Sequence, residues 1–177
     1  MQIETHHEIA LTQTVDAEIA ALLVAAFGQG DGFEGRSFYK QRHHLRVLAR
    51  DNGQLIGHIA LSFRVIRMGD TLVPIIGLAE VATAPDQGGK GVASTLLQET
   101  IKIASGTMAA FILLFGDHPI YERRGFVKVK NTLRFTKIED SRSQEILTMP
   151  TNALHVMAIG SQTWDDAADI DFLGHLF

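Results

Sequence analysis

The sequence predicts an α/β protein in which a mixed, mostly antiparallel sheet carries helices on both faces. Apolar residues recur with helical spacing in two stretches, one ending at Gly28 and one covering residues 92–104. Two strand-like runs, 45–50 and 54–68, flank a tight Asn-Gly turn and predict a long hairpin. The run 75–84 is apolar on both faces, as expected of a central strand. Together these patterns predict strands and helices within a single domain.

The N-terminal part is expected to contribute one strand, one helix and one loop. Residues 6–13 are interpreted as a first strand. In the helix that follows, Ile19, Leu22, Leu23, Ala26 and Phe27 recur at helical spacing, and Gly28 is placed to end it. Residues 28–35 contain four glycines, which predicts a mobile loop or a lid on the substrate side.

The central hairpin leads into the predicted central strand. One face of its second strand carries Leu55, Ile59, Leu61, Phe63 and Val65. A turn at Gly69-Asp70 leads into the strand 71–83, where Gly77 indicates a bulge. Glu80 is the polar exception in this apolar strand.

The C-terminal half alternates short elements. We expect the helix 92–104 to bury Ala93, Leu97, Ile101 and Ala104. The later elements are a buried strand at 108–115, a short helix at 119–124 stopped by Gly125, a bent strand or hairpin at 126–136, a polar loop at 141–144, a strand at 154–159 and an acidic, aromatic tail at 164–177.

Composition limits the functional classes. A chain of 177 residues with 46% hydrophobic and 20% charged residues fits a single globular domain. The net charge of −4 argues against a nucleic-acid partner. The absence of cysteine excludes disulfides, cysteine–zinc sites and a cysteine nucleophile, and the histidine spacing predicts no metal site. No apolar run is long enough for a membrane helix and no signal peptide is apparent, so we expect a cytoplasmic protein.

The most informative segment is the glycine-rich turn that joins the central strand to the second helix. Gly88, Gly89 and Gly91 with Lys90 stand at a helix start, where backbone N–H groups and the helix dipole attract phosphate. A nucleotide P-loop does not fit, because Gly91 follows Lys90 where a hydroxyl residue is needed. The dinucleotide fingerprint fits poorly, because Ser94 occupies its third glycine position.

Residues 88–93 resemble the acyl-CoA motif of the GNAT superfamily of N-acyltransferases, Gln/Arg-x-x-Gly-x-Gly/Ala, with Gly88 in the Gln/Arg position. Residues 119–126 resemble its second signature, Tyr-x-x-x-Gly-Phe. The resemblance implies a single GNAT domain over residues 1–177 that uses acetyl-CoA, or another acyl-CoA, to acylate a small-molecule amine. The cofactor-binding residues it implies are Val81, Ala82, Thr83, Gly88, Gly89, Lys90, Gly91, Val92 and Ala93.

Acyl transfer to an amine requires a base near the amine and an acid near the leaving sulfur. Glu80 is the candidate base, and its apolar neighbours are expected to raise its pKa. The alternative is a structural ion pair, for example with Arg64. The resemblance implies Tyr121 as the acid, and the alternative is a tyrosine that only packs the short helix. Lys90 either approaches the phosphates or stays a solvated surface residue.

Narrower likenesses concern the acceptor. Residues 77–82 and the end of the tail resemble aminoglycoside 2′-N-acetyltransferases, and 77–82 also resemble the nodulation N-acyltransferase. The tail carries four aspartates, which favour a cationic acceptor or form a solvated acidic face. Its aromatic residues are expected to dock on the core or on the second subunit of a homodimer. The alternative function is that of a non-catalytic acyl-CoA sensor. The reason for this alternative is that Gly88 occupies the Gln/Arg position of the motif.

Overall fold

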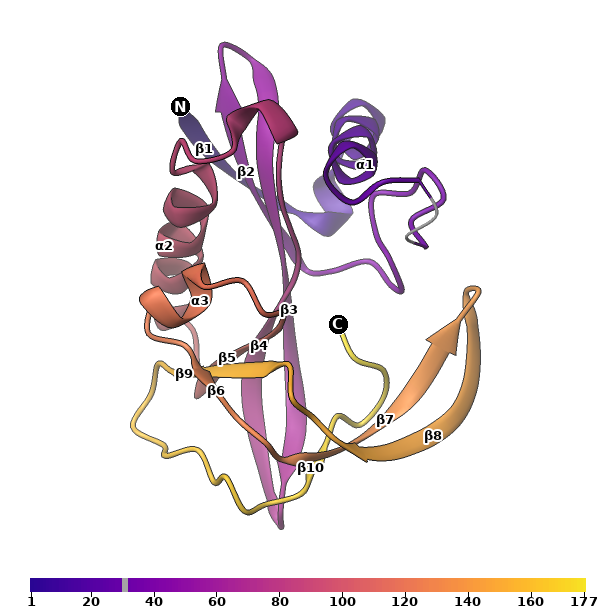
Figure 1. Cartoon of the computed structure of the whole chain (residues 1–177), viewed down its shortest axis with the longest axis vertical. Coiled ribbons are helices and arrows are strands. Elements are labelled where there is room, and N and C mark those ends of the chain that lie inside the picture. Colours follow the sequence, from indigo (N-terminus) through magenta and orange to yellow (C-terminus); the bar gives the residue numbers. More distant parts are fainter. Residues whose placement is uncertain (30–31) are drawn as a thin grey trace. The chain divides into compact units, whose positions relative to one another are not determined.

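The computed structural model describes residues 1–29 and 32–177, which fall into two compact units (Figure 1). The first unit comprises Met1–Ser62 and Ala79–Lys102, and the second comprises Phe63–Leu78 and Ile103–Phe177. Two long strands, β3 (Gln54–Met68) and β4 (Thr71–Thr83), contribute residues to both units.

The first unit is a small antiparallel sheet between two helices. Strand β1 (Gln2–His7) pairs with β2 (Leu45–Asp51), which pairs with β3 across the predicted Asn-Gly turn. Helix α1 (Gln13–Phe27) and helix α2 (Val92–Ser105) lie on opposite sides of these strands (Figure 1). Gly57 allows the close approach of α2, since a Cβ there would lie 2.6 Å from the Val92 side chain. The expectation of helices on both faces is confirmed.

Both helices begin and end for local reasons. The Thr12 hydroxyl accepts a hydrogen bond from the Val15 N–H at 3.3 Å and caps α1. Gly28 ends this helix with a φ of 100°, a conformation that costs glycine little. Helix α2 buries Leu96 and Thr100 in addition to the predicted Leu97 and Ala104.

The second unit has the strand order β6-β9-β5-β4-β3-β10-β7-β8. The pairs β4–β5 and β10–β7 are parallel, whereas β3–β10, β5–β9, β6–β9 and β7–β8 are antiparallel. The sheet is thus mixed and mostly antiparallel, as predicted. The remaining elements are β5 (Phe111–Phe115), α3 (Ile120–Arg123), β6 (Val127–Lys128), β7 (Thr132–Glu139), β8 (Arg142–Pro150), β9 (Leu154–Ala158) and β10 (Ile170–Asp171).

The tail docks on the core of its own unit. Strand β10 pairs with β3 and β7, and Phe172 is fully buried next to it. Arg64 donates hydrogen bonds to the carbonyls of Phe172 and His175, which fixes the tail beyond the strand. Phe177 packs against the rings of Phe115 and Phe172.

Several predicted boundaries are wrong. The first strand covers Gln2–His7 and not 6–13, because the chain turns at a 3₁₀ segment (Glu8–Ala10) whose first N–H bonds to the His44 carbonyl. Of the polar loop predicted at 141–144, residues 142–144 are the start of β8 and Ser141 lies in the preceding turn. Asp140 and Ser141 both have positive φ, which fits a two-residue hairpin turn.

Two further expectations about β3 and β4 are also wrong. Phe63 and Val65 are 38% and 41% exposed, although Leu55, Ile59 and Leu61 on the same predicted face are buried. Gly77 is not a bulge, since its register with β5 continues through Leu78. A side chain at position 77 would overlap the ring of Phe177, so the glycine provides space for that ring.

Part of the predicted lid, residues 30 and 31, lies outside the described residues, and the lid remains a prediction. Within the described part of the chain, no helix combines the length and the apolar character needed to cross a bilayer.

Replacing Gly77 by alanine is expected to destabilise the protein by about 1–3 kcal/mol, because the added methyl group displaces the Phe177 ring. Urea denaturation measures this difference. The matched control is the same change in a Phe177→Ala background, where the extra cost of Gly77→Ala should largely disappear. An equal cost in both backgrounds would contradict the packing described here.

Candidate active site

The glycine turn between β4 and α2 depends on backbone conformation. A short 3₁₀ segment (Pro85–Gln87) follows β4, and α2 begins at Val92. Gly89 and Gly91 have φ values of 75° and 82°, and a Cβ on either would meet no atom within 4 Å. These two glycines are therefore needed for the left-handed conformation and not for space.

This turn has the properties of an anion site. The first N–H groups of α2 have no acceptor within the helix, and they share the positive end of its dipole. Lys90 is exposed beside them, with Nζ 3.3 Å from the Gln87 side-chain oxygen. Gly88 has φ −55° and ψ 139°, and a Cβ there would lie 3.6 Å from the Pro85 carbonyl oxygen. A larger side chain at position 88 is thus sterically tolerated.

Glu80 lies in β4, on the N-terminal side of the glycine turn, and interrupts the regular strand conformation. Its φ of 54° is left-handed, which is unfavourable for a residue with a side chain. Such strain typically costs about 1–3 kcal/mol and persists only where surrounding contacts enforce it. The irregularity of β4 is therefore at Glu80. Of the three following residues, Ala82 is buried, while Val81 and Thr83 are half-buried.

The Glu80 carboxylate is buried and ion-paired. Its Oε2 accepts a hydrogen bond from Arg46 Nη1 at 2.8 Å, and its Oε1 accepts one from the Tyr39 backbone N–H at 2.7 Å. The same Oε1 lies 3.0 Å from His43 Nε2, although the two groups are not aligned for a hydrogen bond. Only 4% of the Glu80 side chain is exposed.

Arg46 is fully buried and joins Glu80 to a second carboxylate. Its Nε and Nη2 donate to the two oxygens of Glu8 at 2.6 and 3.0 Å, and Nη1 also donates to the Ser37 carbonyl. The ion-pair alternative weighed for Glu80 therefore holds, but the partner is Arg46 on β2 and not Arg64.

These contacts reverse the expected titration of Glu80. Burial is the largest effect and would raise the pKa of Glu80, but the contacts with His43 and Arg46 together outweigh it. The pKa of Glu80 consequently lies below its usual value, and the expectation of a raised pKa is wrong. The carboxylate is ionised at neutral pH.

His58 fixes the backbone of Glu80. Its Nδ1 lies 2.8 Å from the Glu80 carbonyl oxygen and its Nε2 lies 3.0 Å from Arg46 Nη1. Since a guanidinium only donates and a carbonyl only accepts, Nδ1 carries the proton and the ring is neutral. Burial, followed by the charge of Arg46, lowers the pKa of His58 to about 4.

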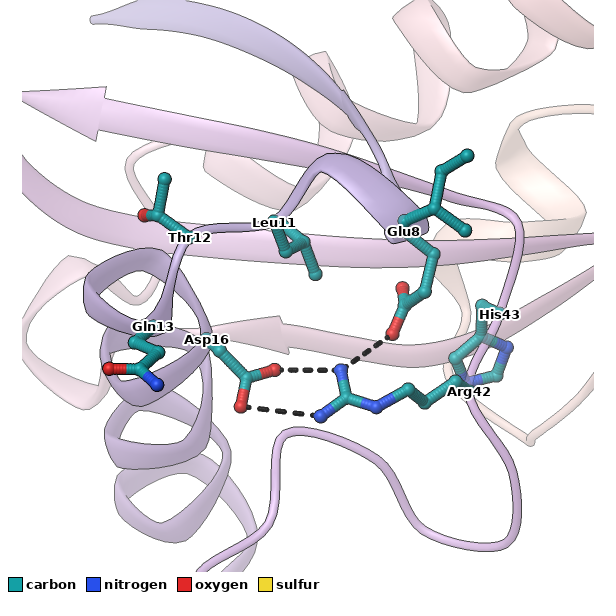
Figure 2. A pocket seen from close by; sticks show the side chains of 8 residues that line it. Glu8, Leu11, Thr12, Gln13, Asp16, Arg42 and His43 are labelled. Atoms are coloured by element: carbon teal, nitrogen blue, oxygen red, sulfur yellow. Dashed lines mark hydrogen bonds and ion pairs between the residues drawn. The ribbon is translucent and has the colours of Figure 1, made fainter.

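A pocket of about 420 Å³ opens beside this cluster, between the start of α1 and residues 42–43 (Figure 2). Figure 2 shows the Arg42 guanidinium between two carboxylates, with Nη1 2.9 Å from Asp16 Oδ1 and 3.1 Å from Glu8 Oε1. His43 also lines the pocket. The carboxylates of Glu8 and Asp16 thus both pair with the Arg42 guanidinium in this pocket.

Tyr121 belongs to the second unit and lies on α3. It is buried against the rings of Phe126, His118 and His155. Burial raises the pKa of Tyr121, so its phenol is protonated at neutral pH. The ring packs as the structural alternative requires, and its hydroxyl is in the protonation state that a proton donor needs.

The sequence prediction missed the partners of Glu80, above all His43 and Arg46, and it missed Glu8, the second carboxylate bound to Arg46. A signal was present on β3, where His58 and Ser62 follow each other at even spacing on one face of an otherwise apolar strand. Arg46 likewise interrupts an apolar strand. Polar residues at strand spacing in apolar surroundings indicate a buried polar network.

Comparison with known proteins gives one consistent result. The model of the family described as "Acetyltransferase (GNAT) domain" matches residues 10–129. A GNAT family acetyltransferase from Brucella melitensis, solved with acetyl-CoA, has a TM-score of 0.62 and 22% identity over 96% of this chain and 94% of that chain. YhbS from Escherichia coli, a GNAT family N-acetyltransferase solved with CoA, gives 0.63 and 21% over 97% of this chain and 88% of that chain. No curated protein sequence matches.

The low pKa of His58 predicts a loss of stability in mild acid. Between pH 6.5 and about 4 the unfolded chain binds a proton that the folded state excludes, so the free energy of unfolding falls as the pH falls. We expect a loss of roughly 2–3 kcal/mol by pH 4.5. Glu8 and Glu80, whose pKa values are lowered, contribute their losses at still lower pH.

Urea denaturation between pH 7.5 and 4.5 measures this slope. His58→Gln should flatten it, whereas the exposed His7→Gln control should retain it. If His58→Gln keeps the parental slope, the buried histidine is not its source.

Proposed function

Since the chain belongs to the GNAT acetyltransferase family, we propose that it transfers an acetyl group from acetyl-CoA to the primary amine of a small, cationic acceptor. The observation that carries the proposal is the glycine turn at the start of α2, whose left-handed Gly89 and Gly91 direct the chain around an anion site. Two structures similar to this chain were solved with acetyl-CoA and with CoA, respectively.

The proposed acetyl-CoA site follows the chain from β4 into α2. The pyrophosphate binds to the backbone N–H groups of residues 88–93 and to the Lys90 ammonium. The pantetheine arm runs along Val81, Ala82 and Thr83, where β4 leaves the strained residue Glu80. Gly88 provides no side chain to the pyrophosphate, so the backbone carries more of the binding than in family members with Gln or Arg at this position.

The proposed chemistry is direct attack by the amine on the thioester. The acceptor ammonium loses a proton, the amine nitrogen attacks the carbonyl carbon, and the CoA thiolate leaves. Glu80 provides the negative charge that favours removal of the proton, and Tyr121 donates a proton to the thiolate. The acylated nitrogen then loses its second proton, which restores the Tyr121 phenol and leaves a neutral amide and a thiol. The ionised Glu80 and the protonated Tyr121 are the starting states that these roles require.

The proposed acceptor carries positive charge. The net charge of −4 favours a cation, and aminoglycosides, amino sugars and polyamines fit. We further propose a single functional domain over residues 1–177 and a cytoplasmic location. The monomer and the homodimer remain alternatives.

Gly91→Asp tests the acetyl-CoA site. A carboxylate against the pyrophosphate should lower CoA affinity more than about tenfold, or 1.4 kcal/mol, in calorimetry. Gly53→Asp is the matched control, since Gly53 has a φ of 84° and open space around it but lies in the hairpin turn. Equal CoA affinity in Gly91→Asp and Gly53→Asp would remove the basis of the proposal.

Gly88→Gln tests the same site in the opposite direction. The added amide fits the backbone and can donate one hydrogen bond to the pyrophosphate, which should increase CoA affinity roughly fivefold, equivalent to about 1 kcal/mol. Gly88→Glu, of nearly equal size but anionic, should lower the affinity. If both variants behave alike, position 88 does not face the pyrophosphate.

Glu80→Gln and Tyr121→Phe test the proton chemistry. Each should lower kcat at neutral pH by about 10²–10⁴-fold with little change in acetyl-CoA affinity. Glu80→Gln removes the charge that favours loss of the ammonium proton, Tyr121→Phe removes the proton donor, and both changes keep the shape of the side chain. Thiol release with acetyl-CoA and a panel of tobramycin, glucosamine and spermidine measures the rates. Tight acetyl-CoA binding with no turnover of any amine by the parent protein would favour the sensor alternative.

A further inference from the structure

We propose that Ser62, His43 and Glu80 form a proton relay in which His43 receives the proton of the acceptor amine by way of the Ser62 hydroxyl. The relay deepens the proposed acetyl transfer and rests on it. It assigns the role of base to His43. Glu80 then positions the imidazole ring and places a negative charge beside it.

The three side chains form one continuous chain of contacts within the first unit. His43 Nδ1 lies 2.9 Å from Ser62 Oγ, and His43 Nε2 lies 3.0 Å from Glu80 Oε1. The side chains of His43 and Glu80 are 5% and 4% exposed, and Ser62 is 6% exposed. They come from the segment before β2, from β3 and from β4, so the fold and not the local sequence assembles them.

The contacts determine which nitrogen of His43 can accept a proton. Glu80 is ionised, and a carboxylate oxygen 3.0 Å from Nε2 is tolerated only when Nε2 carries hydrogen. Neutral His43 is therefore protonated on Nε2. Its Nδ1 has a free electron pair, which accepts the Ser62 hydroxyl hydrogen. This is the arrangement of a base whose proton donor is the serine hydroxyl.

Charged groups of both signs surround the relay. Glu80 on β4 touches His43 Nε2, Glu8 before α1 interacts with the same ring, Arg46 on β2 bonds to both carboxylates, and Asp16 on α1 and Arg42 line the same pocket as His43. The remaining neighbours are neutral, namely His58 and Ser62 on β3. Among these described groups, three carboxylates lie beside two guanidinium ions, so the charged groups around the relay carry one net negative charge.

Glu80 itself is poorly suited to hold the proton. Its carboxylate already receives hydrogen bonds from Arg46 Nη1 and the Tyr39 N–H, and these donors favour the ionised state. A carboxylate with a lowered pKa is a weak base at neutral pH. Its place beside His43 is comparable to that of the buried acid in a Ser-His-Asp arrangement.

The relay balances protons and bonds. The Ser62 hydroxyl hydrogen moves to His43 Nδ1 while an ammonium hydrogen of the acceptor moves to Ser62 Oγ, which leaves a neutral amine and an imidazolium. The amine nitrogen then bonds to the thioester carbon, the carbon–sulfur bond breaks, and the thiolate takes the proton of the proposed acid. The acylated nitrogen gives up its second hydrogen as a proton, which restores the proposed acid and leaves a neutral amide and a thiol. The imidazolium later releases its proton to water through the pocket that His43 lines.

The first test is independent of turnover. Nitrogen-15 spectra of the histidine-labelled protein report the tautomer of each ring, and His43→Gln assigns the His43 signals. We expect neutral His43 to carry its proton on Nε2, and we expect Ser62→Ala to shift the Nδ1 signal while Ser62→Thr, which keeps a hydroxyl, restores it. A proton on Nδ1 of neutral His43 would overturn the relay.

The second test is the pH profile of kcat/KM for the panel amine with the greatest thiol release. His43→Gln and Ser62→Ala should lower kcat/KM for the amine about 10²-fold or more near pH 7 without weakening acetyl-CoA binding. The deficit should shrink as the pH approaches the pKa of the amine itself, because the free amine needs no base. Ser62→Thr should recover most of the rate.

The two proposals fail in different ways. A constant deficit at every pH would mean that His43 and Ser62 only support the structure, and the relay would be wrong while CoA binding and the proposed function stood. Loss of the expected CoA binding difference between Gly91→Asp and Gly53→Asp would instead count against acetyl transfer, even with the predicted tautomer of His43.

Discussion

The ion pairs of Arg46 are the interaction on which the first unit depends. One fully buried guanidinium joins the segment before α1, strand β2 and strand β4 through Glu8 and Glu80. Removing one member of such a buried pair typically costs about 3–5 kcal/mol, because the remaining charge is left without a partner. The network therefore fixes the spacing of three elements, and it does so with charged groups that are also available for chemistry.

The same network explains why Glu80 can remain in an unfavourable backbone conformation. Its carboxylate is held by Arg46 and Tyr39, and its carbonyl accepts a hydrogen bond from His58. These bonds tie both the side chain and the main chain of one strained residue, which is the over-determination that strain requires. The left-handed turn also separates the buried part of β4 from the residues that lead to the glycine turn, so one cluster of charges sets the direction of the strand that leads into the proposed CoA site.

The sequence predicted features that depend on neighbouring residues and missed those that depend on distant ones. The turn at Asn52-Gly53, the end of α1 at Gly28 and the short helix before Gly125 follow from local conformational preferences, and they occur as predicted. The start of strand β8, the hairpin partner of β7, was interpreted as a polar loop. This strand is exposed to solvent, and polar residues in an exposed strand resemble a loop when the strand with which they pair is not known. Gly77 was misinterpreted because Phe177, whose ring requires the glycine, lies 100 residues later in the sequence.

The candidate site shows the same division in its chemistry. The phosphate-binding turn could be recognised because its glycines and helix start are contiguous. The titration of Glu80 could not, because the sequence shows only the apolar neighbours that raise its pKa and hides Arg46 and His43, which lower it. A buried carboxylate that is ion-paired with a cation, as Glu80 is with Arg46, is a poor proton acceptor. In the proposed relay the adjacent imidazole of His43 accepts the proton instead. For this reason the histidine next to Glu80, unremarkable in the sequence, becomes the strongest candidate for the base once the fold is known.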